Sequence, residues 1–215
     1  MRVAVSFLLV LAACKNDGTG DPVPKANEPP AGGKLKLAGV YPEDWKCDSI
    51  ATVDALTEVL GGTAREVMTV MPVPRGVPQP CNYQIDAQGE AWTFDVDCRD
   101  DYKRRADALF EQYQQNSAAL VDQYNTQSDA GVKPPPPPPG VDAGLPGHAP
   151  GSAVEVQVGS KGLDHHGQGL IFIDDDAPCY VRVVGPDATR RLELAKLIAK
   201  NLTYANAPMK PRPMR

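Results

Sequence analysis

The side chains best suited to chemistry lie together in the short polar segment Asp164-His165-His166. A carboxylate and two imidazoles are groups that bind transition metals, and glycines on either side allow the backbone to bend. Adjacent residues of a strand point to opposite faces, so the two histidines could share an ion only in a loop. Such a site would need further ligands, for which the aspartates at 174–176 are candidates. We favour the alternative, a polar turn with solvated imidazoles, and predict no cofactor.

A second set of acidic residues suggests a pair of catalytic carboxylates or a calcium site. The D-x-D-x-D-G pattern of a calcium loop is absent, however, and a solvated sheet face followed by a helix N-terminus accounts for the whole set. The sequence also lacks G-x-S-x-G, H-E-x-x-H, the phosphate-binding P-loop and the dinucleotide-binding glycine pattern. It therefore predicts a protein that is not an enzyme. The acidic set comprises Asp95, Asp97, Asp100 and Asp101.

Five cysteines occur in the chain, and Cys14 stands apart from the others because it follows an apolar N-terminal run. The remaining four are an even number, which in an exported chain indicates two disulfides. A zinc site is the alternative, but no two of these cysteines have the C-x-x-C spacing that is typical of zinc ligands. The predicted disulfide cysteines are Cys47, Cys81, Cys98 and Cys179.

The N-terminus has the features of an export signal. A positive start at Arg2 precedes an apolar run over residues 3–13, which is too short to span a bilayer as a helix. The run ends in Leu-Ala-Ala-Cys at residues 11–14, which resembles the bacterial lipobox. Small residues before the cut suit the signal peptidase, and the cysteine thiol receives the lipid. An ordinary signal peptide followed by a chance cysteine is the alternative.

The lipobox resemblance implies that residues 1–13 are removed and that Cys14 is acylated. Membrane lipid is then a partner of the chain, and the domain lies outside the cytoplasm in the cell envelope. One acyl chain binds a bilayer only reversibly, so the two or three chains that the resemblance implies would give stable anchoring. An aspartate directly after the cysteine would retain a lipoprotein at the inner membrane, so Lys15 favours the outer membrane.

Composition limits the class of partner. The net charge is −5, and removal of residues 1–13, which contain Arg2 and no acid, lowers it by one to −6. An acidic domain lacks the basic surface that phosphate contacts require, so we predict no binding to nucleic acid. The hydrophobic content of 42% suffices for the core of one domain, and with 6% aromatic residues that core should be mainly aliphatic.

Low-complexity segments define the domain boundaries. Residues 14–37 are rich in proline and glycine and predict a disordered tether between the lipidated cysteine and a single domain at 38–205. Within the domain, residues 125–152 predict a proline-rich insert with six consecutive prolines, Pro134–Pro139. We favour a rigid spacer over a docking ligand for an aromatic groove. The tail at 206–215 is expected to be disordered.

Hydrophobic periodicity predicts an α+β fold. The clearest signal is a hairpin at 81–98, where apolar and polar residues alternate and both cysteines fall on the buried face. Hairpins separated by helices indicate an antiparallel sheet with about three helices packed on one face. The expected helices are 49–60, 101–124 and 186–202, and the strands outside the hairpin are 64–71, 153–158, 170–173 and 179–184.

Part of the domain resembles the small cysteine-paired lipoprotein domains of unknown function that are common in actinobacteria. The resemblance covers roughly half of the chain, and the proline-rich insert and the second cysteine pair depart from it. It implies export and a fold, but no catalytic residues. The features that it rests on are Cys47 just before a helix, Leu60-Gly61-Gly62 at the end of that helix, Cys81-Asn82-Tyr83 opening a strand, and the ending Ile198-Ala199-Lys200-Asn201-Leu202.

The same resemblance places a disulfide between Cys47 and Cys81. The position of Cys47 before a helix that must pack on the sheet agrees with that bond. Cys98 and Cys179 would then form the second disulfide, because the end of one strand lies beside the start of its antiparallel neighbour.

The sequence thus predicts a membrane-anchored lipoprotein of the cell envelope that acts as a non-catalytic binding or structural module. Its partner would be an unknown envelope protein or ligand. The alternative hypothesis is an envelope metal-binding or sensing protein that uses Asp164-His165-His166.

Overall fold

A computed structural model describes residues 36–86, 89–129 and 152–214. The predicted signal peptide, the lipidation site Cys14, nearly all of the tether and most of the proline-rich insert lie outside these residues. None of the described helices is both long enough and apolar enough to cross a membrane.

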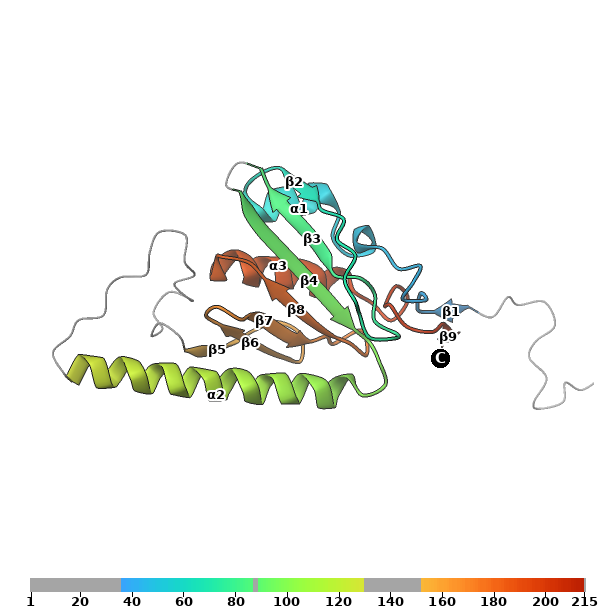
Figure 1. The fold of residues 1–215 in the computed structure, drawn as a ribbon. Helices are drawn as coiled ribbons and strands as arrows, with labels where there is room; N and C mark the ends of the chain where they lie inside the picture. The colour runs from blue at the N-terminus through green and yellow to red at the C-terminus, as the bar shows by residue number, and fades with distance from the viewer. Residues whose placement is uncertain (1–35, 87–88, 130–151, 215) are drawn as a thin grey trace, which may run out of the picture. The chain divides into compact units, whose positions relative to one another are not determined.

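The described chain forms a seven-stranded, fully antiparallel sheet with three α-helices and a separate two-stranded ribbon (Figure 1). The predicted α+β class with an antiparallel sheet is therefore confirmed. In spatial order the sheet is β2-β3-β4-β8-β7-β6-β5, so the first hairpin joins the later strands where β4 pairs with β8. The strands are β1 (Leu37–Ala38), β2 (Ala64–Glu66), β3 (Cys81–Ile85), β4 (Glu90–Asp97), β5 (Ala153–Val156), β6 (Lys161–His165), β7 (Gly169–Ile173), β8 (Tyr180–Val184) and β9 (Arg212–Pro213), and the helices are α1 (Val53–Leu60), α2 (Tyr102–Asp129) and α3 (Ala188–Asn201).

Helices α1 and α3 cover one side of the sheet, which we call face one. The main core lies there, and α1 contributes Leu56 and Leu60 to it. Local sequence sets both ends of α1: the side chain of Thr52 accepts a hydrogen bond from the backbone N–H of Ala55, and Gly61 ends the helix at φ 71°. Asp187 caps α3 in the same way as Thr52 caps α1.

Helix α2 covers the other side, which we call face two, so the prediction that all helices share one face is wrong. The reason is visible in β7, whose residues Gly-Leu-Ile-Phe-Ile are buried throughout. Its alternate side chains Leu170 and Phe172 enter the core on face one, while Ile171 and Ile173 need a cover on face two. Phe110 of α2 belongs to the smaller core that provides this cover.

Two disulfides, Cys47–Cys81 and Cys98–Cys179, are present and match the predicted pairing. Cysteines that pair in this way are typical of exported domains. The second bond lies beside the β4–β8 pairing and links positions 81 residues apart. In the chain-entropy model, a loop of that length makes the bond worth about 4–5 kcal/mol against the unfolded chain.

The C-terminal tail is folded, contrary to the predicted boundary at 205 and the expected disorder of 206–215. Ala207 and Met209 are buried in the core on face one, and β9 pairs with β1. The indole N–H of Trp45 donates to the backbone oxygen of Asn206 at 3.0 Å. A few apolar side chains and backbone hydrogen bonds hold a segment whose prolines suggested disorder. The domain therefore includes residues 36–214, with residue 215 and the interior gaps not described.

Further elements also differ from expectation, and α1 begins at Val53 rather than near 49. Helix α2 continues to Asp129 and so takes in the first residues assigned to the insert at 125–152, of which 130–151 are not described. Strand β2 ends at Glu66 rather than near 71, and in its register β3, which begins at Cys81, offers no partner beyond residue 68. Strand β6 occupies a segment that was predicted to be a polar turn, and pairing on both of its edges holds a sequence of low strand propensity.

Candidate functional site

Asp164 lies on β6 and points to face one, where it forms a buried ion pair with Arg191 of α3. Its two carboxylate oxygens accept hydrogen bonds from Nε and Nη2 of Arg191, each at 2.8 Å, and both side chains are at most 2% exposed. Arg191 also donates to the backbone oxygen of Gly185 at 2.7 Å. A carboxylate held on both oxygens by a guanidinium joins α3 to the sheet and is not open to a metal ion.

His165 points to face two, where α2 covers it. Its ring centre lies 5.5 Å from that of Tyr113, and the side chain is 1% exposed. Its Nδ1 contacts the backbone oxygen of His166, and its Nε2 has no hydrogen-bond partner among the described residues. Burial lowers the pKa of His165 and so favours the neutral ring. The prediction of a solvated imidazole is therefore wrong for His165, because a helix about 50 residues earlier in the chain packs over it.

The structure does not bring Asp164, His165 and His166 together as metal ligands, since the first two lie on opposite faces. Asp174 is also engaged: its Oδ1 accepts hydrogen bonds from the backbone N–H groups two and three residues further on, at 2.9 and 2.6 Å. Burial raises the pKa of Asp174 to about 6. Within the described ranges, no three His, Cys, Asp or Glu side chains are arranged to hold a metal ion.

Each member of the acidic set is paired with an arginine. Of the set, only Asp95 forms its pair across two strands of the seven-stranded sheet. The other three aspartates lie in or next to the turn between β4 and α2 and pair with nearby arginines or, for Asp100, with Arg212 of β9. The pairs are Asp95–Arg182, Asp97–Arg99, Asp100–Arg212 and Asp101 with Arg104 and Arg105.

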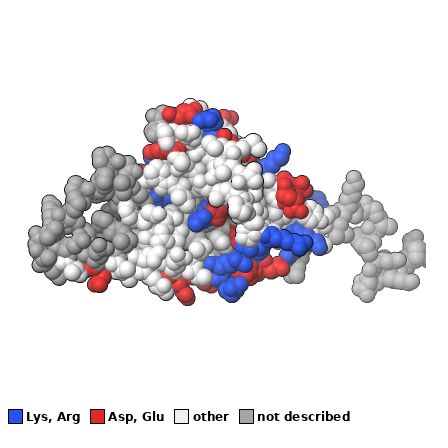
Figure 2. All heavy atoms as spheres, viewed as in Figure 1, with Lys and Arg blue, Asp and Glu red and all other residues white. Residues whose placement is uncertain are grey.

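Face two changes character along the sheet, and this change creates the best candidate for a binding site. Helix α2 packs over the apolar strands β6 and β7, whereas the corresponding side chains of β8, β4 and β3 are mainly polar. A groove of about 500 Å³ lies along this boundary, which we call the face-two groove. Charged side chains are sparse over the region between β4 and α2 (Figure 2). The groove is lined by Met71, Pro80, Asn82, Thr93, Asp95, Leu109, Gln112, Tyr113, Gly167, Gln168, Arg182 and Val184.

The ion pair Asp95–Arg182 forms the floor of the face-two groove. The two residues are directly opposite each other in the β4–β8 register, and Nε and Nη2 of Arg182 both lie 3.0 Å from Oδ2 of Asp95. No hydrogen bond or ion pair to another described residue involves Oδ1 of Asp95 or Nη1 of Arg182. Burial raises the pKa of Asp95, and the nearby positive charge of Arg182 partly counteracts this increase. The pair offers both an acceptor and a donor to a ligand.

The walls of the groove supply further polar groups. Thr93 donates its hydroxyl to Oδ1 of Asn82 at 2.9 Å, which fixes both side chains on the floor. The hydroxyl of Tyr113 donates to the backbone oxygen of Gln168 at 3.1 Å and joins α2 to the β6–β7 turn. Gln112 is exposed on α2 and makes no side-chain hydrogen bond within the described ranges. A preformed floor with adaptable side chains at its rim can bind a ligand.

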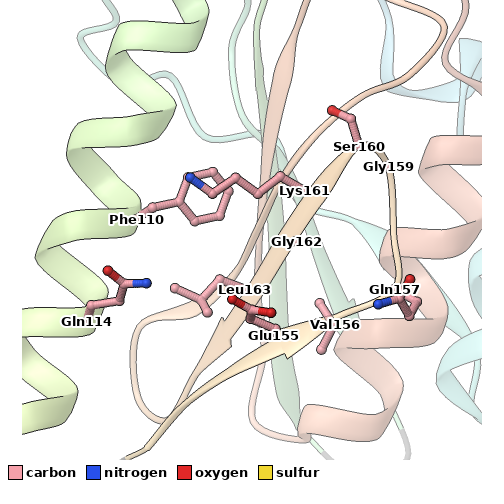
Figure 3. A pocket seen from close by; sticks show the side chains of 10 residues that line it. All are labelled: Phe110, Gln114, Glu155, Val156, Gln157, Gly159, Ser160, Lys161, Gly162 and Leu163. Carbon is pink, nitrogen blue, oxygen red and sulfur yellow. The ribbon is translucent and has the colours of Figure 1, made fainter.

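A smaller hollow of about 180 Å³ lies between α2 and the β5–β6 hairpin, where Phe110 and Gln114 face Lys161 and Leu163 (Figure 3). The ammonium group of Lys161 is already engaged there. It lies 4.2 Å from the ring centre of Phe110 and 3.2 Å from Oδ1 of Asp107. This hollow has less room than the face-two groove.

An apolar hollow of about 390 Å³ flanks the Cys47–Cys81 disulfide. Met68 and Val70 border it and are almost fully exposed. Glu66, Asp48 and Lys46 line the same hollow, so its charged side chains are two carboxylates and one ammonium group. The structure shows no group that identifies what would cover it.

Sequence reasoning did not identify the groove. Arg182 interrupts an otherwise apolar strand and was a visible exception, whereas Asp95 lies on the wet face of the predicted hairpin, where a polar residue is expected. Their pairing joins positions 87 residues apart, and only the strand order reveals it.

Comparisons of the chain with protein-family models, with curated proteins and with solved structures found no match. The resemblance to cysteine-paired lipoprotein domains therefore stays a hypothesis that rests on the residues quoted for it.

Proposed function

We propose that this chain is a membrane-anchored lipoprotein of the cell envelope whose domain acts as a non-catalytic binding module. Lipidation at Cys14 would attach it to a membrane, with the outer membrane favoured by Lys15. The face-two groove would hold its ligand. The observation that carries the binding role is the partly buried Asp95–Arg182 pair, which leaves one acceptor and one donor without a partner among the described residues.

Two features support the envelope location. The two disulfides fit an oxidising compartment outside the cytoplasm. The N-terminal sequence supplies the lipobox-like residues 11–14, which lie outside the described chain.

The chemistry of the groove favours an uncharged ligand. Asp95 neutralises Arg182, so the floor has no net charge with which to attract an ion. Its unused acceptor and donor match a group that both donates and accepts hydrogen bonds, such as a peptide amide or a hydroxyl. The apolar side chains of Met71, Leu109 and Val184 add contact area at the rim.

Anchoring is tested with Cys14→Ala. We expect the unaltered chain to enter the detergent-rich phase on phase separation and to incorporate labelled palmitate, and the variant to do neither. A variant that still partitions with detergent would contradict lipidation at Cys14.

The groove is tested with a photo-crosslinking amino acid at Gln112, and a matched control places the same group at Glu111. Both positions are exposed on α2, but only Gln112 lines the groove. In the intact cell envelope we expect a crosslinked adduct of defined mass at 112 and not at 111. Arg182→Ala should abolish the adduct. Equal adducts at both positions, or an adduct insensitive to Arg182→Ala, would contradict a ligand in this groove.

The metal-binding or sensing alternative has no geometric support among the described residues, because the carboxylate of Asp164 is bound to Arg191. Equilibrium dialysis of the mature chain against divalent transition metals tests it directly. Stoichiometric binding that is lost in His165→Ala would favour the alternative.

A further inference from the structure

The chain enters and leaves the domain at one place, the two-stranded ribbon formed by β1 and β9 (Figure 1). Leu37 lies opposite Pro213, and the backbone N–H of Met214 donates to the backbone oxygen of Lys36 at 2.9 Å. Residues 15–35 connect this ribbon to Cys14. The ribbon is therefore the part of the described domain that is joined most directly to the proposed membrane anchor.

The ribbon combines exposed apolar and basic side chains. Leu37 is 57% exposed and Met214 is 48% exposed. Lys36, Lys210 and Arg212 are exposed beside them. Arg212 is balanced by Asp100 at 2.6 Å, whereas Lys36 and Lys210 form no ion pair with any described residue. Apolar tips flanked by unbalanced lysines are the combination that binds at the interface of an anionic bilayer.

We propose that the β1–β9 ribbon is a membrane-contact surface that binds anionic lipid headgroups, with Leu37 and Met214 placed among the headgroups. The proposal rests on the proposed lipoprotein function, because anchoring at Cys14 brings the domain to the bilayer. Contact at the ribbon would fix which end of the domain faces the lipid.

Charge distinguishes this surface from the other exposed apolar segment of the domain. Met68 and Val70 are more exposed than Leu37 and Met214, but they border a hollow in which two carboxylates outnumber the single lysine, Lys46. This net negative charge disfavours contact with anionic lipid, so we expect that segment not to contribute to membrane binding. Met68 and Val70 therefore provide a matched control for an effect of apolar exposure alone.

The test uses the mature chain with Cys14→Ala, so that no acyl chain contributes. Binding to sedimenting vesicles of phosphatidylglycerol is compared with binding to vesicles of phosphatidylcholine at low and high salt. Three double variants are tested: Lys36→Gln with Lys210→Gln, Leu37→Ser with Met214→Ser, and the control Met68→Ser with Val70→Ser. All six side chains are exposed, and near-ultraviolet circular dichroism checks that each variant is folded.

We expect binding to phosphatidylglycerol only, weakened by salt and lowered on the order of tenfold by the lysine variant. The Leu37 and Met214 variant should lower it several-fold, and the control should leave it unchanged. Absence of binding to phosphatidylglycerol, or an equal loss in the control, would overturn the proposal. Failure of lipidation would be seen separately in the detergent partition of Cys14→Ala, which this experiment does not use as a readout.

Discussion

Two Asp–Arg pairs lie on opposite faces of the same sheet and have the same chemical groups in different surroundings. Asp164–Arg191 on face one is at most 2% exposed and forms one hydrogen bond to each carboxylate oxygen. Asp95–Arg182 on face two is 21% and 43% exposed and directs both contacts to a single oxygen. Because it is buried and bonded at both oxygens, Asp164–Arg191 links α3 to the sheet. Asp95–Arg182 keeps hydrogen-bonding groups that a ligand could use.

The largest loss of stability is expected for Arg191→Met. This change leaves the carboxylate of Asp164 buried without a partner, which should lower the free energy of unfolding by about 3–5 kcal/mol. Urea unfolding followed by circular dichroism measures the loss. If the loss were no larger than that of Arg182→Met, the two pairs would be energetically alike and the comparison would fail.

A double variant separates the cost of leaving a buried charge unpaired from the cost of losing the ion pair itself. Asp164→Leu combined with Arg191→Met replaces the buried pair by apolar side chains, so no charge is left without a partner. We expect its unfolding free energy to return to within about 1–2 kcal/mol of the unaltered protein, since buried pairs are often replaceable by packed apolar groups. A double variant as unstable as Arg191→Met would show that the pair itself, and not the unpaired charge, determines stability.

Protonation of His165, which lies under α2 on face two, should lower the free energy of unfolding in acid. Its pKa is lowered by burial, so the folded state binds fewer protons at this site than the unfolded chain, whose histidine titrates at about 6.5. The contribution of the neutral His165 ring to stability is complete above about pH 6.5. It is lost as the pH falls below that value toward the lowered pKa of the folded state. We expect His165→Gln to remove a slope of at most about 1.4 kcal/mol per pH unit below pH 6.5.

The quantity to measure is the difference in unfolding free energy between the unaltered protein and His165→Gln at each pH. A difference is needed because Asp174 changes stability with pH in the opposite direction. The pKa of Asp174 is raised to about 6, so its contribution is complete below its ordinary value and is lost as the pH rises through 6. Subtraction removes this common effect. Parallel stability curves for the two proteins between pH 7 and 5 would show that His165 is not the sensor.

The smallest expected effect on stability belongs to Arg182→Met. The pair with Asp95 is partly solvated, so its loss should change the unfolding free energy by less than about 1 kcal/mol. The same substitution should abolish the crosslinked adduct at position 112. A large loss of stability, or an adduct that persists, would remove the functional distinction between the two faces.

Local sequence patterns were reliable where neighbouring residues determine the structure. Alternation at 81–98 predicted the β3–β4 hairpin, and the register observed there pairs Tyr83 with Trp92 on the buried face. Gly61 ends α1 and Asp187 caps α3 close to the predicted ends of these helices, whereas the cap Thr52 places the start of α1 later than the predicted residue 49. The four cysteines beyond Cys14 likewise indicated two disulfides, because export and an even number suffice for that inference.

Only the tertiary structure showed which distant segments of the chain contact each other. Lys161–His165 has little strand propensity, yet it is a strand because β5 and β7 pair with both of its edges. His165 is buried because α2 crosses it, and the tail after residue 205 is ordered because Met209 enters the core. The sequence shows Asp95, Asp164, Arg182 and Arg191 as four charged residues of similar appearance. Which two meet in the interior and which two meet in a groove depends on strand order and helix placement, and these arise from contacts summed over the whole domain.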